Sequence, residues 1–179
     1  MDRNVMMKYA EKYIEPILPE NFERISTYDA AFDWGLLTIT EILYSNGKIG
    51  FVLSFCERHQ TIRCGIYRYP FDMVKADDGN LYASKLYSIE LDDLSMLHDG
   101  STDSLLLGDF CAKNSTDGWR IRKRKKLIEE KTDEVFQNIA SEIQRLMMCY
   151  LDGSKEPDFE MWSKYRSERI DASIYPVKS

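Results

Sequence analysis

The first apolar pattern along the chain is that of an amphipathic helix. Between Val5 and Leu18 the hydrophobic residues fall on one face of a 3.6-residue period, and charged residues occupy the opposite face. Pro16 and Pro19 are expected to tighten or end this helix, because proline removes a backbone donor and restricts the residue before it. The sequence therefore predicts an N-terminal helix with one buried face.

Three segments that follow have the composition of β-strands. Leu37–Tyr44, Ile49–Cys56 and Thr61–Tyr67 are rich in β-branched and aromatic residues. The first two are joined through Asn46-Gly47, which is typical of a type I′ hairpin turn because both residues tolerate a positive φ angle. We therefore expect a three-stranded antiparallel meander.

The two hairpin turns predict a register. A turn centred on Asn46-Gly47 places Ile42 opposite Phe51. A turn centred on Arg58-His59 places Phe51 opposite Ile66. One face of the meander is then almost entirely apolar and needs a covering layer. The expected rows on this face are Ile42/Phe51/Ile66, Thr40/Leu53/Cys64 and Thr38/Phe55/Ile62.

Shorter elements are expected beyond the meander. Residues 72–80 are interpreted as a loop because they are rich in Asp, Gly and Asn. Leu86–Leu91 is predicted as a fourth strand, and Asp92-Asp93 as the start of a short helix that ends at Asp99-Gly100. Leu105–Leu107 is a buried run for which a strand is favoured.

A second, longer amphipathic helix is predicted from Val135 to Tyr150, with Thr132 as its N-cap and Gly153 placed to stop it. The predicted fold is therefore α+β, an antiparallel β-meander of about four strands covered by an N-terminal and a long C-terminal amphipathic helix. Residues 1–153 are expected to form this single domain. Residues 154–179 are expected to form a C-terminal arm with a short helix, packed on its own chain or on another.

Composition and charge indicate one soluble globular domain. The chain has 179 residues, of which 44% are hydrophobic, and its formal net charge is −6. A domain of this size buries roughly 70% of its unfolded surface, and this composition excludes global disorder. No segment approaches the roughly 18 consecutive apolar residues of a membrane span, so no membrane partner is expected. The start of the chain lacks an apolar signal core, and a cytoplasmic location is expected.

Cysteine and histidine positions argue against several chemistries. The four cysteines form no C-x-x-C pair and have no histidines at zinc-ligand spacing. Cys56, Cys64 and Cys149 lie in apolar patterns and are expected to be buried, because a free thiol behaves as a small hydrophobe. The motifs of serine hydrolases, dinucleotide-binding proteins, P-loop proteins, zinc proteases and EF-hands are absent from the sequence. No cofactor and no metal site are therefore expected, and no catalytic residue is assigned.

Residues 72–109 form the most acidic part of the sequence, with nine acidic residues against two lysines. A concentrated field of one sign steers a partner of the opposite sign, so this stretch predicts a docking surface for a basic protein. Turn and capping chemistry explains the same aspartates equally well. A third interpretation is a Mg²⁺ or Ca²⁺ site, although the spaced D-x-D-x-D-G loop is absent. The residues assigned to the docking surface are Asp77, Asp78, Asp92, Asp93, Asp99 and Asp103.

A compact basic run, Arg120–Lys126, suggests a nucleic-acid binder as an alternative. In that interpretation the run contacts phosphates and Trp119 stacks on a base. Glu129 and Glu130 lie four residues beyond the last two lysines of the run and would partly neutralise them on a helix. A solvated helix start is therefore favoured, and nucleic acid is not the expected partner.

An enzyme without a familiar motif is the remaining alternative. His98 is its candidate residue because the neighbouring Asp99 and other carboxylates could orient an imidazole. A pocket around His98 would favour this interpretation, and a solvated His98 would argue against it.

The order of elements resembles that of many small acidic bacterial immunity proteins. The resemblance covers an N-terminal amphipathic helix, an antiparallel meander joined at Asn46-Gly47, an acidic loop region and a closing C-terminal helix. It is a likeness of architecture and acidity, so no functional residue is carried over from it. It implies a non-enzymatic protein that binds and neutralises one basic toxin, commonly a nuclease. Secretion chaperones share the same small acidic α+β character.

Overall fold

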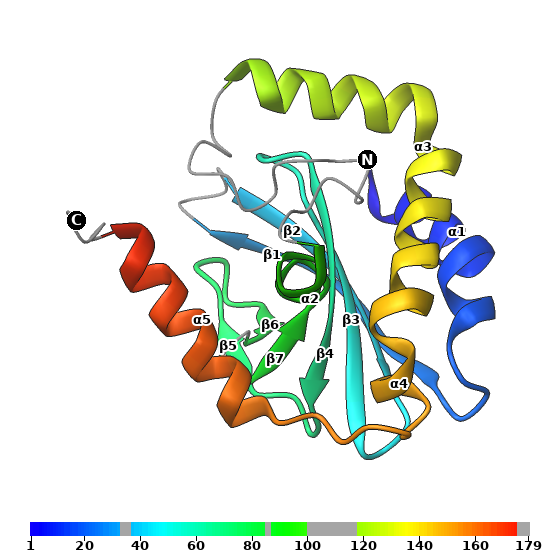
Figure 1. Cartoon of the computed structure of the whole chain (residues 1–179). Helices are drawn as coiled ribbons and strands as arrows, with labels where there is room; N and C mark the ends of the chain where they lie inside the picture. Colours follow the sequence, from blue (N-terminus) through cyan, green and yellow to red (C-terminus); the bar gives the residue numbers. More distant parts are fainter. Residues whose placement is uncertain (33–36, 85–86, 100–117, 175–179) are drawn as a thin grey trace.

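An antiparallel sheet with helices along one face is the frame of this protein (Figure 1). The computed structural model describes residues 1–32, 37–84, 87–99 and 118–174. Its elements in chain order are α1 (Arg3–Tyr9), the π-helical turn η1 (Ala10–Ile14), the 3-10 turn η2 (Glu15–Ile17), β1 (Glu23–Phe32), β2 (Leu37–Ser45), β3 (Ile49–Cys56), β4 (Thr61–Arg68), β5 (Met73–Lys75), β6 (Leu81–Ala83), β7 (Ser88–Glu90), α2 (Leu91–Asp99), α3 (Gly118–Leu146), α4 (Met148–Leu151) and α5 (Phe159–Ile174). The strand order is β1-β2-β3-β4-β7, and β5 pairs with β6 in a separate two-stranded sheet.

The predicted α+β class is confirmed, and the two predicted helices cover the predicted apolar face. Figure 1 shows α1 and the second part of α3 side by side along the same side of the sheet. The rings of Tyr9 and Phe136 stack between them, with centroids 5.2 Å apart. The tightening expected at Pro16 is the 3-10 turn η2. The core on this face includes Met6, Ala10, Ile14, Ile42, Tyr44, Phe51, Leu53, Phe55, Ile62, Ile66, Phe136 and Ile143.

The register of the second hairpin is confirmed, whereas that of the first is wrong by two residues. Phe51 pairs with Ile66 as expected, but Ile42 pairs with Leu53 instead of Phe51. The reason is the turn, where the Asn46 side chain accepts hydrogen bonds from the N–H groups of the two residues after Gly47. Asn46 therefore precedes the turn, and Gly47 takes the positive φ, +82°. A shift of two preserves the face of every side chain, so the predicted apolar face survives the error.

Two strand regions escape the sequence prediction. β1 is a ten-residue edge strand that pairs with β2, with a bulge between Arg24 and Ser26. Residues 72–80, interpreted as a loop, instead begin a small hairpin of β5 and β6. The predicted fourth strand is present as β7, which pairs with β4. Leu105–Leu107 lies outside the described residues.

The long C-terminal helix begins earlier than predicted. α3 starts at Gly118 and is kinked at Lys131, where φ is −135° and ψ is 34°. Thr132 is not an N-cap in the predicted sense, because its hydroxyl donates to the carbonyl oxygen of Ile128 in the preceding turn. Figure 1 shows the part before the kink crossing one end of the sheet and the part after it running beside α1. Gly153 follows α4 with a φ of +80°.

The segment after Gly153 contains α5, which packs against β7. Trp162 on this helix is 3% exposed and belongs to the main core. Its ring meets Tyr165 edge to face, with centroids 5.5 Å apart. This part of the arm therefore packs on its own chain.

Candidate protein-binding groove

The outer edge of β1 is bonded to residues of the β5–β6 hairpin. At one end the N–H of Ala31 donates to Asp78 Oδ2 at 2.8 Å, and the carbonyl oxygen of Asp29 accepts from Asn80 Nδ2 at 3.1 Å. These groups point away from β2, and in an antiparallel strand the outward direction recurs at every second residue. Thr27 therefore also directs its N–H and C=O outward. Thr27 also lines the groove described next, and outward backbone groups of this kind are where a further strand can pair with a sheet edge.

A groove of about 800 Å³ runs beside this edge. One wall comes from β1 and β2, and the other from residues 69–81, which include the hairpin. Figure 1 shows the hairpin on the side of the sheet opposite α1. Apolar side chains contribute to both walls, among them Ile25, Leu43, Phe71, Met73 and Leu81.

Several of these apolar side chains are exposed. Ile25 is 49% exposed and Leu81 is 50% exposed, and Met73 and Val74 on β5 are exposed as well. Isolated apolar residues are normal on a protein surface, whereas a cluster of exposed apolar residues is typical of interaction sites. Arg3 and Asp29, which both line the groove, form an ion pair at 2.5 Å.

A buried carboxylate fixes the hairpin wall. Glu41 on β2 is 1% exposed, and its Oε2 accepts hydrogen bonds from the hydroxyl of Tyr28 at 2.5 Å and from the N–H of Ala83 at 3.1 Å. Burial, reinforced by the charge of Glu41, raises the pKa of Tyr28 well above its usual value. The Tyr28 hydroxyl therefore stays protonated and donates to Glu41. Glu41, a charged residue within an otherwise apolar strand, attaches β6 to the sheet through the N–H of Ala83.

The hairpin is also seated by close packing. Phe71 lies over Gly50 so closely that any side chain at residue 50 would overlap its ring. The ring meets Tyr69 and Tyr67 edge to face, with centroids 5.5 and 6.2 Å away. Glycine at this strand position is therefore explained by the approach of an aromatic ring.

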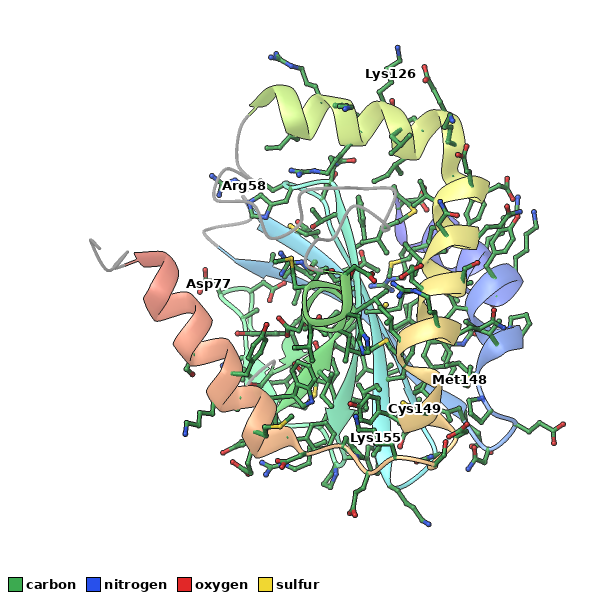
Figure 2. All side chains as sticks on the ribbon, in the orientation of Figure 1. Arg58, Asp77, Lys126, Met148, Cys149 and Lys155 are labelled. Carbon is green, nitrogen blue, oxygen red and sulfur yellow. The ribbon has the colours of Figure 1, made fainter. Side chains whose placement is uncertain are left out.

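The six aspartates assigned to a docking surface do not form one surface. Asp77 and Asp78 are exposed at the tip of the β5–β6 hairpin, close to the covered end of the β1 edge. Figure 2 shows Asp77 on the side of the sheet away from α1. Asp92 and Asp93 lie in the first turn of α2 as predicted, but they are 8% and 2% exposed, so their carboxylates are too buried to contact another protein.

The remaining two aspartates are elsewhere. Asp99 ends α2, and its two oxygens accept from Arg145 on α3 at 3.2 and 2.5 Å. This hydrogen bonding lowers the pKa of the Asp99 carboxyl. Asp103 lies outside the described residues. Of the predicted set, the structure therefore brings only Asp77 and Asp78 beside the groove.

The basic run occupies the first part of α3, and its members differ in environment. Arg124 is buried and donates from Nε to the carbonyl oxygen of His59 at 3.0 Å. Lys125 and Lys126 form the expected i,i+4 pairs with the following glutamates, at 3.9 and 3.8 Å. Figure 2 shows Lys126 pointing away from the sheet. The run is therefore partly structural and partly neutralised, and the side chain of Trp119 lies outside the described residues.

The candidate catalytic histidine is not enclosed. His98 is exposed near the end of α2, and the carboxylate beside it in sequence is bonded to Arg145. Cys64 is buried as expected, Cys56 is half-buried, and Cys149 is exposed, so burial of the last was wrongly predicted. Cys149 sits on the short α4 helix, whose buried residues are its neighbours Tyr150 and Leu151.

Comparisons with family models, with curated proteins and with solved structures gave no match. No helix in the described part of the chain is long and apolar enough to cross a membrane. Within those same ranges, no group of three His, Cys, Asp or Glu side chains is arranged to hold a metal ion.

Proposed function

We propose that this protein is a non-enzymatic binding module that receives an extended segment of a partner protein in the groove along the outer edge of β1. The observation that carries the proposal is the groove along β1 with exposed Ile25 and Leu81 in its lining, beside a strand whose Ala31 N–H already bonds outward. A strand added to a sheet edge gains affinity from main-chain hydrogen bonds and specificity from its alternate side chains. In this proposal the β1 edge provides the main-chain hydrogen bonds, and the groove receives the side chains of the added strand.

The partner is proposed to be a basic protein. The chain carries a net charge of −6, and the exposed pair Asp77 and Asp78 lies at one end of the groove. A carboxylate pair at a groove end favours a cationic residue beside the docked segment and speeds encounter. Neutralisation of a basic toxin, as in immunity proteins, is the form of this function that fits the charge. The cytoplasm is the proposed compartment, where free thiols such as Cys64 remain reduced.

Variants of the groove test the proposal against a matched surface variant. Ile25→Glu and Leu81→Glu place a charge at the groove, whereas Leu97→Glu places the same charge on α2, where Leu97 is 59% exposed. Each tagged protein is used to capture proteins from a lysate of its host, and the bound proteins are identified by mass spectrometry. We expect one stoichiometric protein on wild type and Leu97→Glu, with affinity reduced about tenfold or more by either groove variant.

The charge of the partner is tested on the captured protein. Asp77→Lys should slow its association and flatten the dependence of the association rate on salt, because steering acts on encounter. Glu156→Lys, an exposed residue after α4, is the matched control and should have a smaller effect. If wild type and both groove variants retained the captured protein equally, the groove would not be its binding site. Recovery of nucleic acid alone, lost on neutralising Arg122 and Lys123, would replace the proposal with nucleic-acid binding.

A further inference from the structure

A thiol and an imidazole meet at the turn between β3 and β4. Cys56 is the last residue of β3, and its Sγ lies 3.5 Å from Nδ1 of His59. The turn is held by hydrogen bonds from the N–H of Glu57 to the carbonyl oxygen of Thr38 at 3.0 Å, and from the N–H of Gln60 to that of Glu57 at 3.3 Å. The contact between sulfur and imidazole is therefore set by backbone geometry.

The turn closes through an uncommon backbone conformation. Gln60 has a φ of +52°, the left-handed region, and its side-chain amide donates to the carbonyl oxygen of Glu57 at 2.6 Å. This geometry lets the chain reverse within a few residues, so that the ring of His59 returns to the sulfur of Cys56. The side chain of Gln60 is buried, which keeps the turn in this form.

Three arginines act on His59. Arg124 of α3 donates to the carbonyl oxygen of His59 at 3.0 Å, and Arg58 and Arg63 act electrostatically on the same ring. Burial of the ring, reinforced by the three guanidinium groups, lowers the pKa of His59. A neutral imidazole presents a lone pair to a thiol proton, so His59 is placed to act as the base for Cys56.

We propose that Cys56 and His59 form a reactive thiol site that is oxidised by hydroperoxides. His59 accepts the proton of the Cys56 thiol at Nδ1, and the thiolate attacks one oxygen of the peroxide. An S–O bond forms as the O–O bond breaks, so sulfur loses two electrons and the peroxide is reduced. The leaving oxygen takes the proton from His59, and the products are Cys56 sulfenic acid and water or an alcohol.

The other described cysteines lack this arrangement. Cys64 is buried, and burial together with the charges of Glu90 and Asp92 raises the pKa of its thiol. Cys149 is exposed on α4, and Figure 2 shows it at the end of the molecule opposite to Arg58, which marks the β3–β4 turn. Exposure alone therefore favours Cys149, whereas the chemical environment favours Cys56.

Because exposure favours Cys149 and the contact with His59 favours Cys56, the two cysteines can be compared within one molecule. The full chain is treated with limiting hydrogen peroxide in the presence of dimedone, which traps sulfenic acids, and labelling of each cysteine is measured by peptide mass spectrometry. We expect Cys56 to be labelled faster than the more exposed Cys149. His59→Gln should slow labelling of Cys56 about tenfold or more, because a positioned base is lost, and leave Cys149 unchanged.

Two further variants separate activation from structure. Arg58→Gln removes one cation from the exposed side of the turn and should slow Cys56 labelling by less than His59→Gln does. Cys56→Ser should abolish the label at this peptide and leave that of Cys149 unchanged, with circular dichroism used to confirm that each variant is folded. Faster labelling of Cys149 than of Cys56, or an unchanged Cys56 rate in folded His59→Gln, would overturn the proposal. Groove variants such as Leu81→Glu should not alter the rate, so this proposal and the binding function fail separately.

Discussion

Arg124 Nε donates a hydrogen bond to the carbonyl oxygen of His59 at 3.0 Å and thereby joins the first part of α3 to the β3–β4 turn. Arg124 is 4% exposed, whereas Lys123 and Lys125 beside it are exposed. A guanidinium is tolerated at this depth because it carries several donors on a long apolar stem. One member of the basic run therefore holds the fold together and is not available to a partner.

Replacement of Arg124 tests that structural role. Arg124→Met keeps the apolar stem but removes the donor, leaving the carbonyl oxygen of His59 without this partner. We expect the free energy of unfolding to fall by about 1–3 kcal/mol, the cost of an unsatisfied buried group. Urea denaturation gives the change, and Lys123→Met on the exposed side of the same helix should cost much less. Equal effects of the two substitutions would contradict a specific role for Arg124.

The pKa of His59 predicts how stability depends on pH. Burial and the charges of Arg58, Arg63 and Arg124 lower this pKa below 6.5, the usual value for histidine. The folded state therefore holds fewer protons than the unfolded state when the pH falls below 6.5, and its stability decreases. The contribution of His59 is complete above that value and is lost as the pH falls through the folded pKa.

His59→Gln removes this titration. Relative to the variant, wild type should lose free energy of unfolding progressively below pH 6.5, while the difference stays constant at higher pH. Urea denaturation across a pH series measures it. Arg58→Gln is the control that retains the histidine, and it should reduce the loss because one repelling cation is removed. A difference between wild type and His59→Gln that does not change with pH would show that the folded state leaves this titration unaltered.

The apolar face of the sheet could be predicted because side-chain alternation alone specifies it. The assignment survives a two-residue register error at Asn46, since a shift of two leaves Ile42 and Leu53 on the same face. β1 could not be found this way, because its sequence alternates weakly and mixes Asp29 with small residues such as Ala30. Its place was decided by pairing with β2, which is a tertiary interaction.

The candidate site was less predictable than the fold. Acidic residues near one another in sequence separate in space, and Asp93 is buried at the start of α2 while Asp77 is exposed at a hairpin tip. The groove depends on residues from β1, β2 and the β5–β6 hairpin, which are distant along the chain. Leu81 and Ile25 line the groove from different elements, and no pattern in the sequence pairs them.

Gly50 and Phe71 should be energetically coupled. A methyl group at residue 50 overlaps the Phe71 ring, which is also confined by Tyr67 and Tyr69. Gly50→Ala is therefore expected to destabilise the protein by about 1–3 kcal/mol, the usual cost of overpacking. In a Phe71→Ala background the overlap is gone, and Gly50→Ala should be neutral or stabilising, because alanine loses less backbone entropy than glycine on folding. A double-mutant cycle by urea denaturation measures the coupling, and additive effects would contradict the contact.

Asp78 should control whether the hairpin wall of the groove stays attached to β1. Its Oδ2 accepts from the N–H of Ala31 at 2.8 Å, and its own N–H donates to the carbonyl oxygen of Ala31 at 3.3 Å. Asp78→Ala removes the first bond, so the Ala31 amide should exchange with solvent at least about tenfold faster. Asp77→Ala is the matched control at the adjacent exposed residue and should leave that amide unchanged. Hydrogen exchange followed by NMR resolves the Ala31 amide, and equal protection in both variants would mean that the hairpin is held by Glu41 and Phe71 without the help of Asp78.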